Sequence, residues 1–139
     1  MKVDGSELCL LSDPDWEASQ CRFAPDSSKV LFVPFDYRER VSRIFVTDRS
    51  GAKPKQVTAA LNAEVLGACF SPDGKSIAAI CRQTYANPTP NQKAEFVLML
   101  MDADGRHRRT LLSETRNMPA DISAAFQLNW ITLSGLDWR

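Results

Sequence analysis

The residues of this sequence that could perform chemistry are one histidine, four cysteines and short runs of aspartate. The histidine, His107, lies in the arginine-rich stretch 106–109, directly after Gly105. A serine hydrolase needs a nucleophile, an imidazole base and an orienting acid, and the sequence has no Gly-x-Ser-x-Gly motif. We therefore assign no catalytic residue. We expect His107 to be an exposed turn residue whose protonated form is disfavoured by the neighbouring cations.

The other candidate ligands do not form a metal motif. The four cysteines are Cys9, Cys21, Cys69 and Cys81. None belongs to a Cys-x-x-Cys pair, whereas tetrahedral zinc sites usually need close ligand pairs. The run Asp102-x-Asp104-Gly105 is similar to the start of a calcium loop, but its twelfth position is Ser113 instead of glutamate. We expect no metal and no cofactor, and we expect the cysteines to be small buried hydrophobes in preference to a disulfide.

Composition restricts the classes of partner. The 139 residues include 17 basic and 17 acidic side chains, so the formal net charge is zero. A neutral chain has no long-range attraction to nucleic acid or to an anionic membrane, and we predict neither partner. No apolar run is long enough to span a bilayer as a helix, and the first residues do not resemble a secretory signal. A cytoplasmic location is expected for the chain as given, or a periplasmic one if it is cut from a longer precursor.

The candidate residues named above are positioned by an internal repeat of the sequence. Phe23–Val33 (FAPDSSKVLFV) and Phe70–Ile80 (FSPDGKSIAAI) share a turn followed by an apolar run. A second apolar block ending in aspartate follows each copy, at 44–48 and 98–102, and a short strand-like segment then completes each copy, at 56–58 and 110–112. The extra residues of the second copy fall in one polar stretch, as expected for a repeat with fixed strands and variable loops.

The local pattern predicts strands and tight turns. Pro72 presets φ, Asp73 can bond its own backbone, and Gly74 accepts a positive φ, so the chain should reverse at this point. The second copy then reads as strand a at 67–70, strand b at 77–81, strand c at 96–101 and strand d at 108–112. Four antiparallel strands in about 45 residues is the size of a propeller blade. The predicted fold class is therefore all-β: propeller blades of four antiparallel strands in an incomplete ring, with about two full blades plus a partial blade. The predicted divisions are an outer d strand at 1–12, blade one at 13–58, blade two at 59–113, and a partial third blade or tail at 114–139.

At these residues the sequence resembles the TolB-like β-propeller repeats. The resemblance rests on Phe70–Lys75, Ile77–Ile80, Met101-Asp102 and Asp104-Gly105, and the first copy departs from it at Ser27, where the family has glycine. It implies a rigid interaction platform of the kind found in periplasmic import machinery. Related propellers form the gating domains of prolyl oligopeptidase-type peptidases and the body of some polysaccharide lyases, so the fold does not fix the function.

Two blades do not make a ring, because a propeller usually needs at least four. Their open apolar faces should be covered either by further copies of the chain or by more of a longer protein. A homo-oligomer or a longer chain is therefore expected. The leading strand at 6–12 suggests closure by strand exchange.

The long loops are the best candidates for binding a protein partner. Aromatic and arginine side chains on exposed loops are the types that dominate binding hot spots. The candidate partner-binding residues are Trp16, Tyr37, Arg38, Arg40, Tyr85 and Asn87. Equally, Trp16 and Tyr37 could pack beneath their own loops. The favoured function is a non-catalytic protein-interaction scaffold that uses these loops. The alternative is an accessory propeller segment of a larger hydrolase or polysaccharide lyase.

Overall fold

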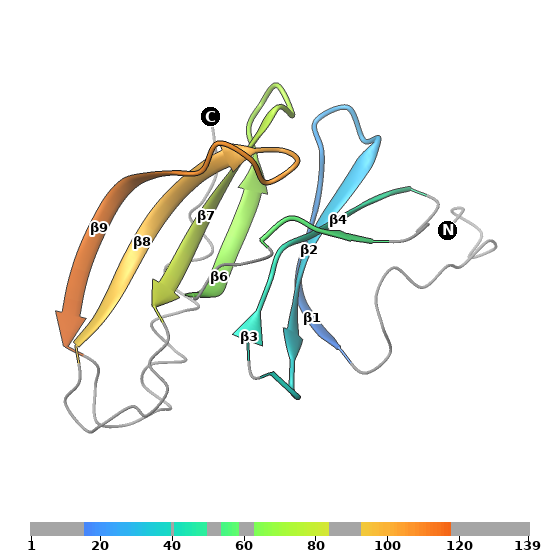
Figure 1. Cartoon of the computed structure of the whole chain (residues 1–139). Coiled ribbons are helices and arrows are strands. Elements are labelled where there is room, and N and C mark those ends of the chain that lie inside the picture. The colour runs from blue at the N-terminus through green and yellow to red at the C-terminus, as the bar shows by residue number, and fades with distance from the viewer. Residues whose placement is uncertain (1–15, 40, 50–53, 59–62, 84–92, 118–139) are drawn as a thin grey trace.

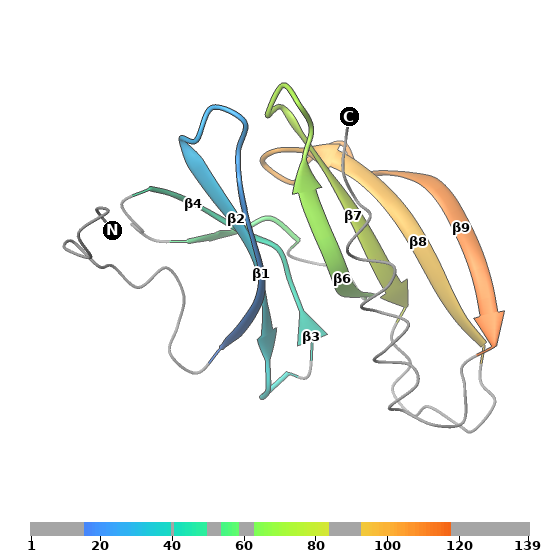
Figure 2. The same ribbon diagram turned by 180° about the vertical axis from the view of Figure 1, so that it is seen from behind.

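Two antiparallel sheets face each other in the computed structural model of the chain, as the views from the front and from behind both show (Figures 1 and 2). The structure describes residues 16–39, 41–49, 54–58, 63–83 and 93–117. The first sheet, called the first blade below, contains β1 (Glu17–Phe23), β2 (Lys29–Asp36), β3 (Val41–Ser42), β4 (Phe45–Asp48) and β5 (Lys55–Gln56). The second sheet, the second blade, contains β6 (Ala63–Phe70), β7 (Ser76–Gln83), β8 (Lys93–Asp102) and β9 (Arg109–Asn117).

Strand order follows chain order in both blades. The first runs β1-β2-β4-β5, with the short β3 also paired to β2, and the second runs β6-β7-β8-β9. All pairings are antiparallel, and the described residues contain no helix. The predicted all-β architecture of four-stranded blades is confirmed. The numerical division of the chain stays a prediction, since residues 1–12 and most of 114–139 lie outside the described part.

The Ser-Pro-Asp-Gly segment forms the hairpin turn between β6 and β7. The Asp73 Oδ1 atom accepts hydrogen bonds from the Ser71 hydroxyl (2.6 Å) and the Lys75 amide (3.0 Å). Gly74 adopts a φ of 70°, which favours glycine. The equivalent turn of the first blade places Ser27 at a φ of 57°, a conformation that costs a non-glycine residue about 1 kcal/mol.

The core lies between the blades. Because side chains alternate across a strand, one face of the first blade presents Leu31, Val33, Ile44 and Val57, while the second blade turns Phe70, Ile77, Ala79 and Met101 toward them. We call this packed interface the joint. Burial of each larger side chain in it stabilises the fold by about 1.5–3 kcal/mol.

Polar contacts fix the joint at its rim. Arg108 donates from Nη2 to the Val57 carbonyl of the first blade (3.0 Å) and from Nε to the Gly105 carbonyl (2.9 Å). Gln20 of β1 donates from Nε2 to the carbonyl of Leu66 in β6, across the joint (3.0 Å). Buried Thr58 accepts the Ile44 amide at 2.8 Å, which holds the end of the first blade in place.

The cysteines match the prediction only in part. Cys69 and Cys81 are buried free thiols, and burial raises the pKa of Cys81 to about 11. Cys21 is exposed, so its predicted burial is wrong. It stands opposite Phe32 in the register between β1 and β2, on the edge strand of the first blade, where a small side chain is left accessible. Cys9 lies outside the described residues.

Candidate functional site

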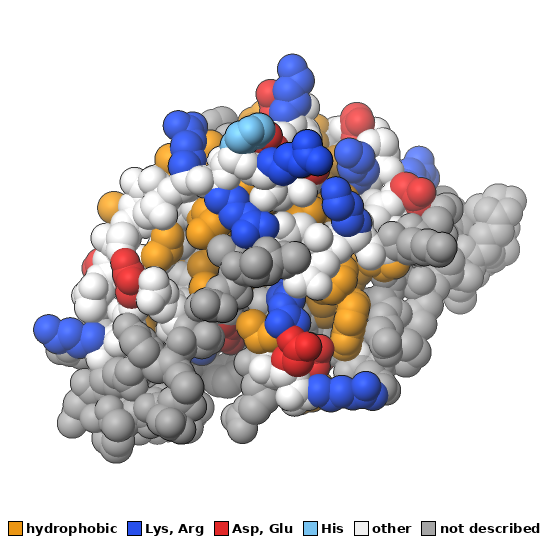
Figure 3. Space-filling model, in the orientation of Figure 1, with side chains coloured by type: hydrophobic (Ala, Val, Ile, Leu, Met, Phe, Trp, Pro, Cys, Tyr) orange, Lys and Arg blue, Asp and Glu red, His pale blue; other side chains and the backbone are white. Residues whose placement is uncertain are grey.

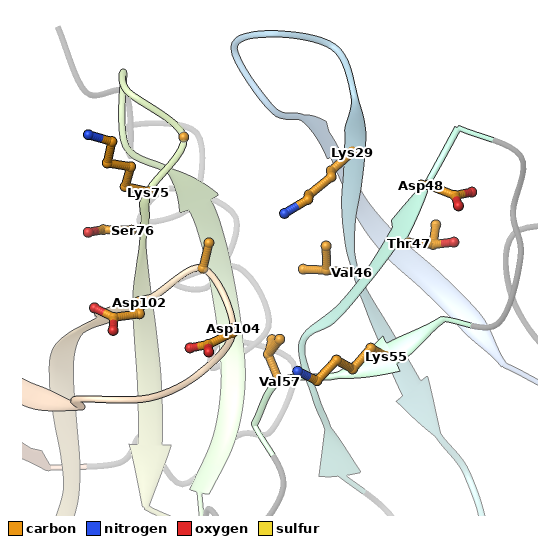
Figure 4. Close-up of a pocket in the computed structure, with 12 residues that line it drawn as sticks. Lys29, Val46, Thr47, Asp48, Lys55, Val57, Lys75, Ser76, Asp102 and Asp104 are labelled. Atoms are coloured by element: carbon orange, nitrogen blue, oxygen red, sulfur yellow. The ribbon is translucent and has the colours of Figure 1, made fainter.

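An open groove of about 760 Å³ lies between the blades (Figure 4). It is at the end of the molecule that carries the tight hairpin turns (Figure 1). The first blade contributes Lys29 and Lys55, which extend toward the second blade, and the second blade contributes Asp102 and Asp104 (Figure 4). The described residues that line it are Lys29, Val46, Thr47, Asp48, Lys55, Val57, Gly74, Lys75, Ser76, Asp102, Ala103 and Asp104.

The charges of this groove are mixed. Its lining includes three lysines, three aspartates and the apolar side chains of Val46 and Val57. Acidic and basic side chains are also interspersed over the visible surface at this end (Figure 3). In the described part of the chain, no three histidine, cysteine, aspartate or glutamate side chains gather to hold a metal ion. The groove therefore suits a polar segment carrying both signs of charge better than a single anion or cation.

His107 and Asp102 form a pair at the surface. The His107 Nδ1 atom lies 2.6 Å from Asp102 Oδ2; the His107 side chain is largely exposed and that of Asp102 is half exposed. This contact, together with the carboxylate charge, raises the pKa of His107 despite the nearby Arg106. Our expectation that cations disfavour its protonated form is wrong, because the turn between β8 and β9 brings the Asp102 carboxylate into contact with the imidazole ring. No described hydroxyl or thiol bonds to this imidazole, so the pair has no adjacent nucleophile there.

The arginine cluster is not a free basic patch. Arg106 pairs with Asp104 (3.3 Å) in the turn, and Arg108 is engaged at the joint. Arg109 begins the outermost strand, β9. A charged outer strand discourages pairing with the edge of another sheet.

The opposite end of the first blade presents an ordered aromatic residue. Tyr37 is 60% exposed and lies beyond β2, where its ring meets Phe35 edge-on at a centroid distance of 5.0 Å. Its hydroxyl bonds to the Glu17 carboxylate, which raises the pKa of Tyr37. Two contacts therefore hold the ring of Tyr37 while one of its sides stays accessible.

The turn that follows Tyr37 is fixed by Asp36. Asp36 Oδ1 accepts hydrogen bonds from the amides of Arg38 (2.8 Å) and Glu39 (3.1 Å), and these bonds lower the pKa of Asp36. An ion pair between Glu39 and Arg43 closes the hairpin into β3. The amide of Arg38 and the amide of the next residue are therefore both hydrogen-bonded, and these bonds hold the backbone that carries the Arg38 side chain.

The remaining candidates differ in placement. Trp16 is half-buried, and its ring packs on Phe45 at a centroid distance of 4.7 Å. This placement is close to the alternative in which Trp16 packs beneath its own loop. Arg40, Tyr85 and Asn87 lie outside the described residues. Of the three candidates in the described part of the chain, Tyr37 and Arg38 lie together on one exposed turn.

Comparison with solved structures identifies the architecture. A structure assigned as TolB from Agrobacterium tumefaciens matches 79% of this chain with a TM-score of 0.60 and 17% sequence identity. TolB from Acinetobacter baumannii matches 79% with a TM-score of 0.54 and 19% identity. The chain has the TolB-like β-propeller fold. It spans 39% of the length of the first TolB chain and 25% of the second.

Other comparisons add little to the TolB-like fold. An acylaminoacyl peptidase in complex with Z-Gly-Gly-Phe-chloromethyl ketone matches 72% of the chain at 19% identity, with a TM-score of 0.46, below the level at which a shared fold is assigned. No family model and no curated protein matches the sequence. Among the described residues of this TolB-like chain, no helix is long and apolar enough to cross a membrane.

Sequence reasoning missed two contacts of the TolB-like blades. The first is the close approach of the Gly105 backbone to the Val57 carbonyl. It joins residues from different repeats, and no local sequence pattern indicates it. The bond from Tyr37 to Glu17 crosses the β1–β2 pair, and the strand register could have indicated it, since Glu17 stands opposite Phe35.

Proposed function

We propose that this chain is a non-catalytic, protein-binding module that presents a rigid TolB-like scaffold. It contacts its partner through the loop end of the blades, which is the end opposite the tight turns and carries Tyr37 and Arg38. The observation that carries the proposal is Tyr37, an exposed ring fixed by Phe35 and Glu17 beside the hydrogen-bonded turn of Arg38. An aromatic ring held before binding loses little conformational entropy when a partner arrives. Tyrosine and arginine are also the residue types enriched in binding hot spots.

The partner is a protein with a shallow apolar pocket for the Tyr37 ring. The site is a convex turn, which fits a concave partner surface better than a small molecule. The alternative assignment, to an accessory segment of a larger hydrolase or polysaccharide lyase, stays a prediction.

Photo-crosslinking tests the proposal. A benzophenone amino acid replaces Tyr37 in the full chain, and the protein is expressed in the cells that naturally make it. The matched control carries the same probe at Asp73, in the exposed turn at the opposite end. We expect a discrete protein adduct from position 37 and none from position 73. Equal adducts at both positions, or none at position 37, would contradict the proposal.

Affinity measurements with the captured partner then test the chemistry. Tyr37→Ala should weaken binding by about 2 kcal/mol, roughly 30-fold, and Arg38→Glu by at least tenfold. Lys75→Glu reverses a charge at the opposite end and should leave affinity unchanged. An equal loss from all three variants would exclude the loop end as the specific surface.

A further inference from the structure

The second blade has an apolar side that is turned away from the joint. The residues on either side of Cys69 in β6, and those on either side of Ala78 in β7, belong to the core between the blades. Because side chains alternate across a strand, Cys69 and Ala78 point to the other side of the sheet. They stand opposite each other in the register of β6 and β7. We call this side of the second blade its outer face.

Apolar side chains continue over the outer face to the last strand of the sheet. Ala78 stands opposite Leu100 of β8. Leu98 of β8 lies between Ile80 of β7 and Leu112 of β9. Directly opposed side chains on neighbouring strands lie close enough to pack together. The outer face therefore presents apolar side chains on all four strands of the second blade.

Burial on the outer face is uneven. Ala78 is 1% exposed and Cys69 is 8% exposed, whereas Leu112 is 61% exposed. Leu98 and Leu100, between them, are half-buried. Within the described residues, no strand packs against this face, since β7, β8 and β9 contact only strands of their own sheet. A narrow cover over β6 and β7 that leaves β9 open accounts for the difference, and it suits one segment of chain better than a whole sheet.

The sequence after β9 supplies a segment of matching character. Residues 126–130, called the C-terminal segment below, read Phe-Gln-Leu-Asn-Trp. Apolar and polar types alternate strictly along it, which is typical of a strand that buries one side. The C-terminal segment therefore has an apolar side, with two aromatic rings, that needs a surface to cover it.

The end of β9 places this segment within reach of the outer face. β9 ends at Asn117, opposite Lys93, which is the end of the sheet at which β6 begins at Ala63 (Figure 1). Neighbouring strands are about 4.8 Å apart, so β6 lies about 14 Å across the sheet from β9. Residues 118–125 can span up to about 26 Å when extended. Residues 57–62 make a connection of similar length from β5 to β6.

We propose that the apolar side of the C-terminal segment packs on the outer face, over β6 and β7. The small side chains of Cys69 and Ala78 leave room there for its aromatic rings. β6 has the same relation to the first blade, because it follows an outermost strand and packs on the preceding sheet. The segment would thus be the inner strand of the predicted partial third blade. This inference is independent of the proposed role of Tyr37.

Intramolecular photo-crosslinking tests the position of the segment. A benzophenone amino acid replaces Trp130 in the full chain, so an aromatic ring is retained. We expect an adduct within one molecule, mapped by mass spectrometry to residues 63–83. The matched control carries the probe at Asn129, on the polar side of the segment, and should not form this adduct. Overturning results are an adduct of position 130 with the first blade, an adduct with another molecule, or no adduct at all.

Thiol protection provides a second test, because two cysteines report the two sides of the second blade. Cys69 lies on the outer face and Cys81 in the joint. In a background whose other two cysteines are serine, Trp130→Asp should accelerate the labelling of Cys69 by roughly tenfold or more and leave that of Cys81 unchanged. Gln127→Asp, on the polar side, should change neither rate.

Two results of the labelling would contradict the proposal. If Cys69 stays protected in Trp130→Asp, another segment or another protein covers the outer face. If both cysteines are accelerated equally, the segment supports the fold as a whole and has no specific contact with this face.

Discussion

The Cα of Gly105 lies so close to the carbonyl of Val57 that a Cβ added to Gly105 would stand 2.2 Å from that oxygen. Gly105 also has a φ of 86°, in the region that favours glycine. The turn between β8 and β9 can therefore reach the first blade only with a glycine at its tip. Arg108 holds the same carbonyl from the other side of the turn.

Gly105→Ala should consequently destabilise the protein by more than its backbone conformation alone accounts for. We expect a loss of about 3 kcal/mol in the free energy of unfolding, from the left-handed φ and the clash combined. Gly74→Ala is the matched control, because its φ is 70° but its added Cβ would meet only Pro25 Cδ at 3.6 Å. The control should lose about 1 kcal/mol. Equal losses in urea-induced unfolding would show that the approach to Val57 is unimportant.

Arg108→Met should weaken the joint by about 1 kcal/mol, since it removes charge-assisted hydrogen bonds to the carbonyls of Val57 and Gly105. Methionine retains most of the apolar stem, so the change isolates the guanidinium. Arg109→Met, at the adjacent exposed position, should change stability by less than about 0.5 kcal/mol. The comparison fails if both variants unfold at the same urea concentration.

His107 should titrate above its ordinary pKa because Asp102 stabilises the imidazolium. The chain has a single histidine, so one set of imidazole NMR signals reports the titration. Asp102→Asn should lower the pKa, whereas Arg109→Met should leave it nearly unchanged. A pKa that does not respond to Asp102→Asn would show that the pair is not formed in solution.

The same pair predicts the sign of a pH effect on stability. A histidine whose pKa is raised on folding stabilises the folded state fully below its unfolded pKa of about 6.5, and this contribution is lost as pH rises through the folded pKa. The stability difference between the wild type and His107→Gln should therefore be larger at pH 5.5 than at pH 8.5. Thermal unfolding at both pH values measures it, and a difference that grows with pH would contradict the assignment.

Ser71→Ala should destabilise the β6–β7 turn by about 1 kcal/mol. The buried Ser71 hydroxyl donates to Asp73 and accepts the Ser76 amide at 2.9 Å, so its removal leaves that amide without this partner. Thr115→Ala, on exposed β9, is the control and should change stability by less than about 0.5 kcal/mol. Alanine occurs naturally at the equivalent position of the first blade, Ala24. A stable Ser71→Ala variant would mean that the second turn tolerates alanine equally well.

Thiol labelling should separate the cysteines by burial. In a Cys9→Ser background at neutral pH, Cys21 should react promptly with a disulfide reagent. Cys69 and Cys81 should react only at the rate of unfolding, since both are buried and the raised pKa of Cys81 disfavours its thiolate. Three thiols reacting at one rate in the absence of denaturant would contradict this placement.

The hairpins were accessible to sequence reasoning, whereas the contacts between them were not. Pro72, Asp73 and Gly74 each encode the β6–β7 turn through their own backbone chemistry. The strands followed from short apolar runs between such turns. The pKa of His107, by contrast, depends on how the c–d turn folds back toward Asp102, and the neighbouring arginines in the sequence gave the opposite sign.

The sequence also could not show which aromatic side chains are exposed. Tyr37 and Trp16 are both aromatic residues beside a strand, and the sequence left packing and binding equally open for each. In the structure Trp16 packs on Phe45, whereas Tyr37 extends past the end of β2. Burial at a strand end depends on which neighbouring strand reaches that far, and single-sequence patterns do not contain this information.

The strand order of the two sheets has a consequence for the kinetics of folding. Every described strand pairs only with strands close to it in sequence, and the two blades share no ladder. Each hairpin can therefore close at a small loop entropy and zip before the blades meet. Docking of one preformed sheet on the other becomes the late event, so changes at Gly105 or Arg108 should accelerate unfolding while leaving the refolding rate nearly constant.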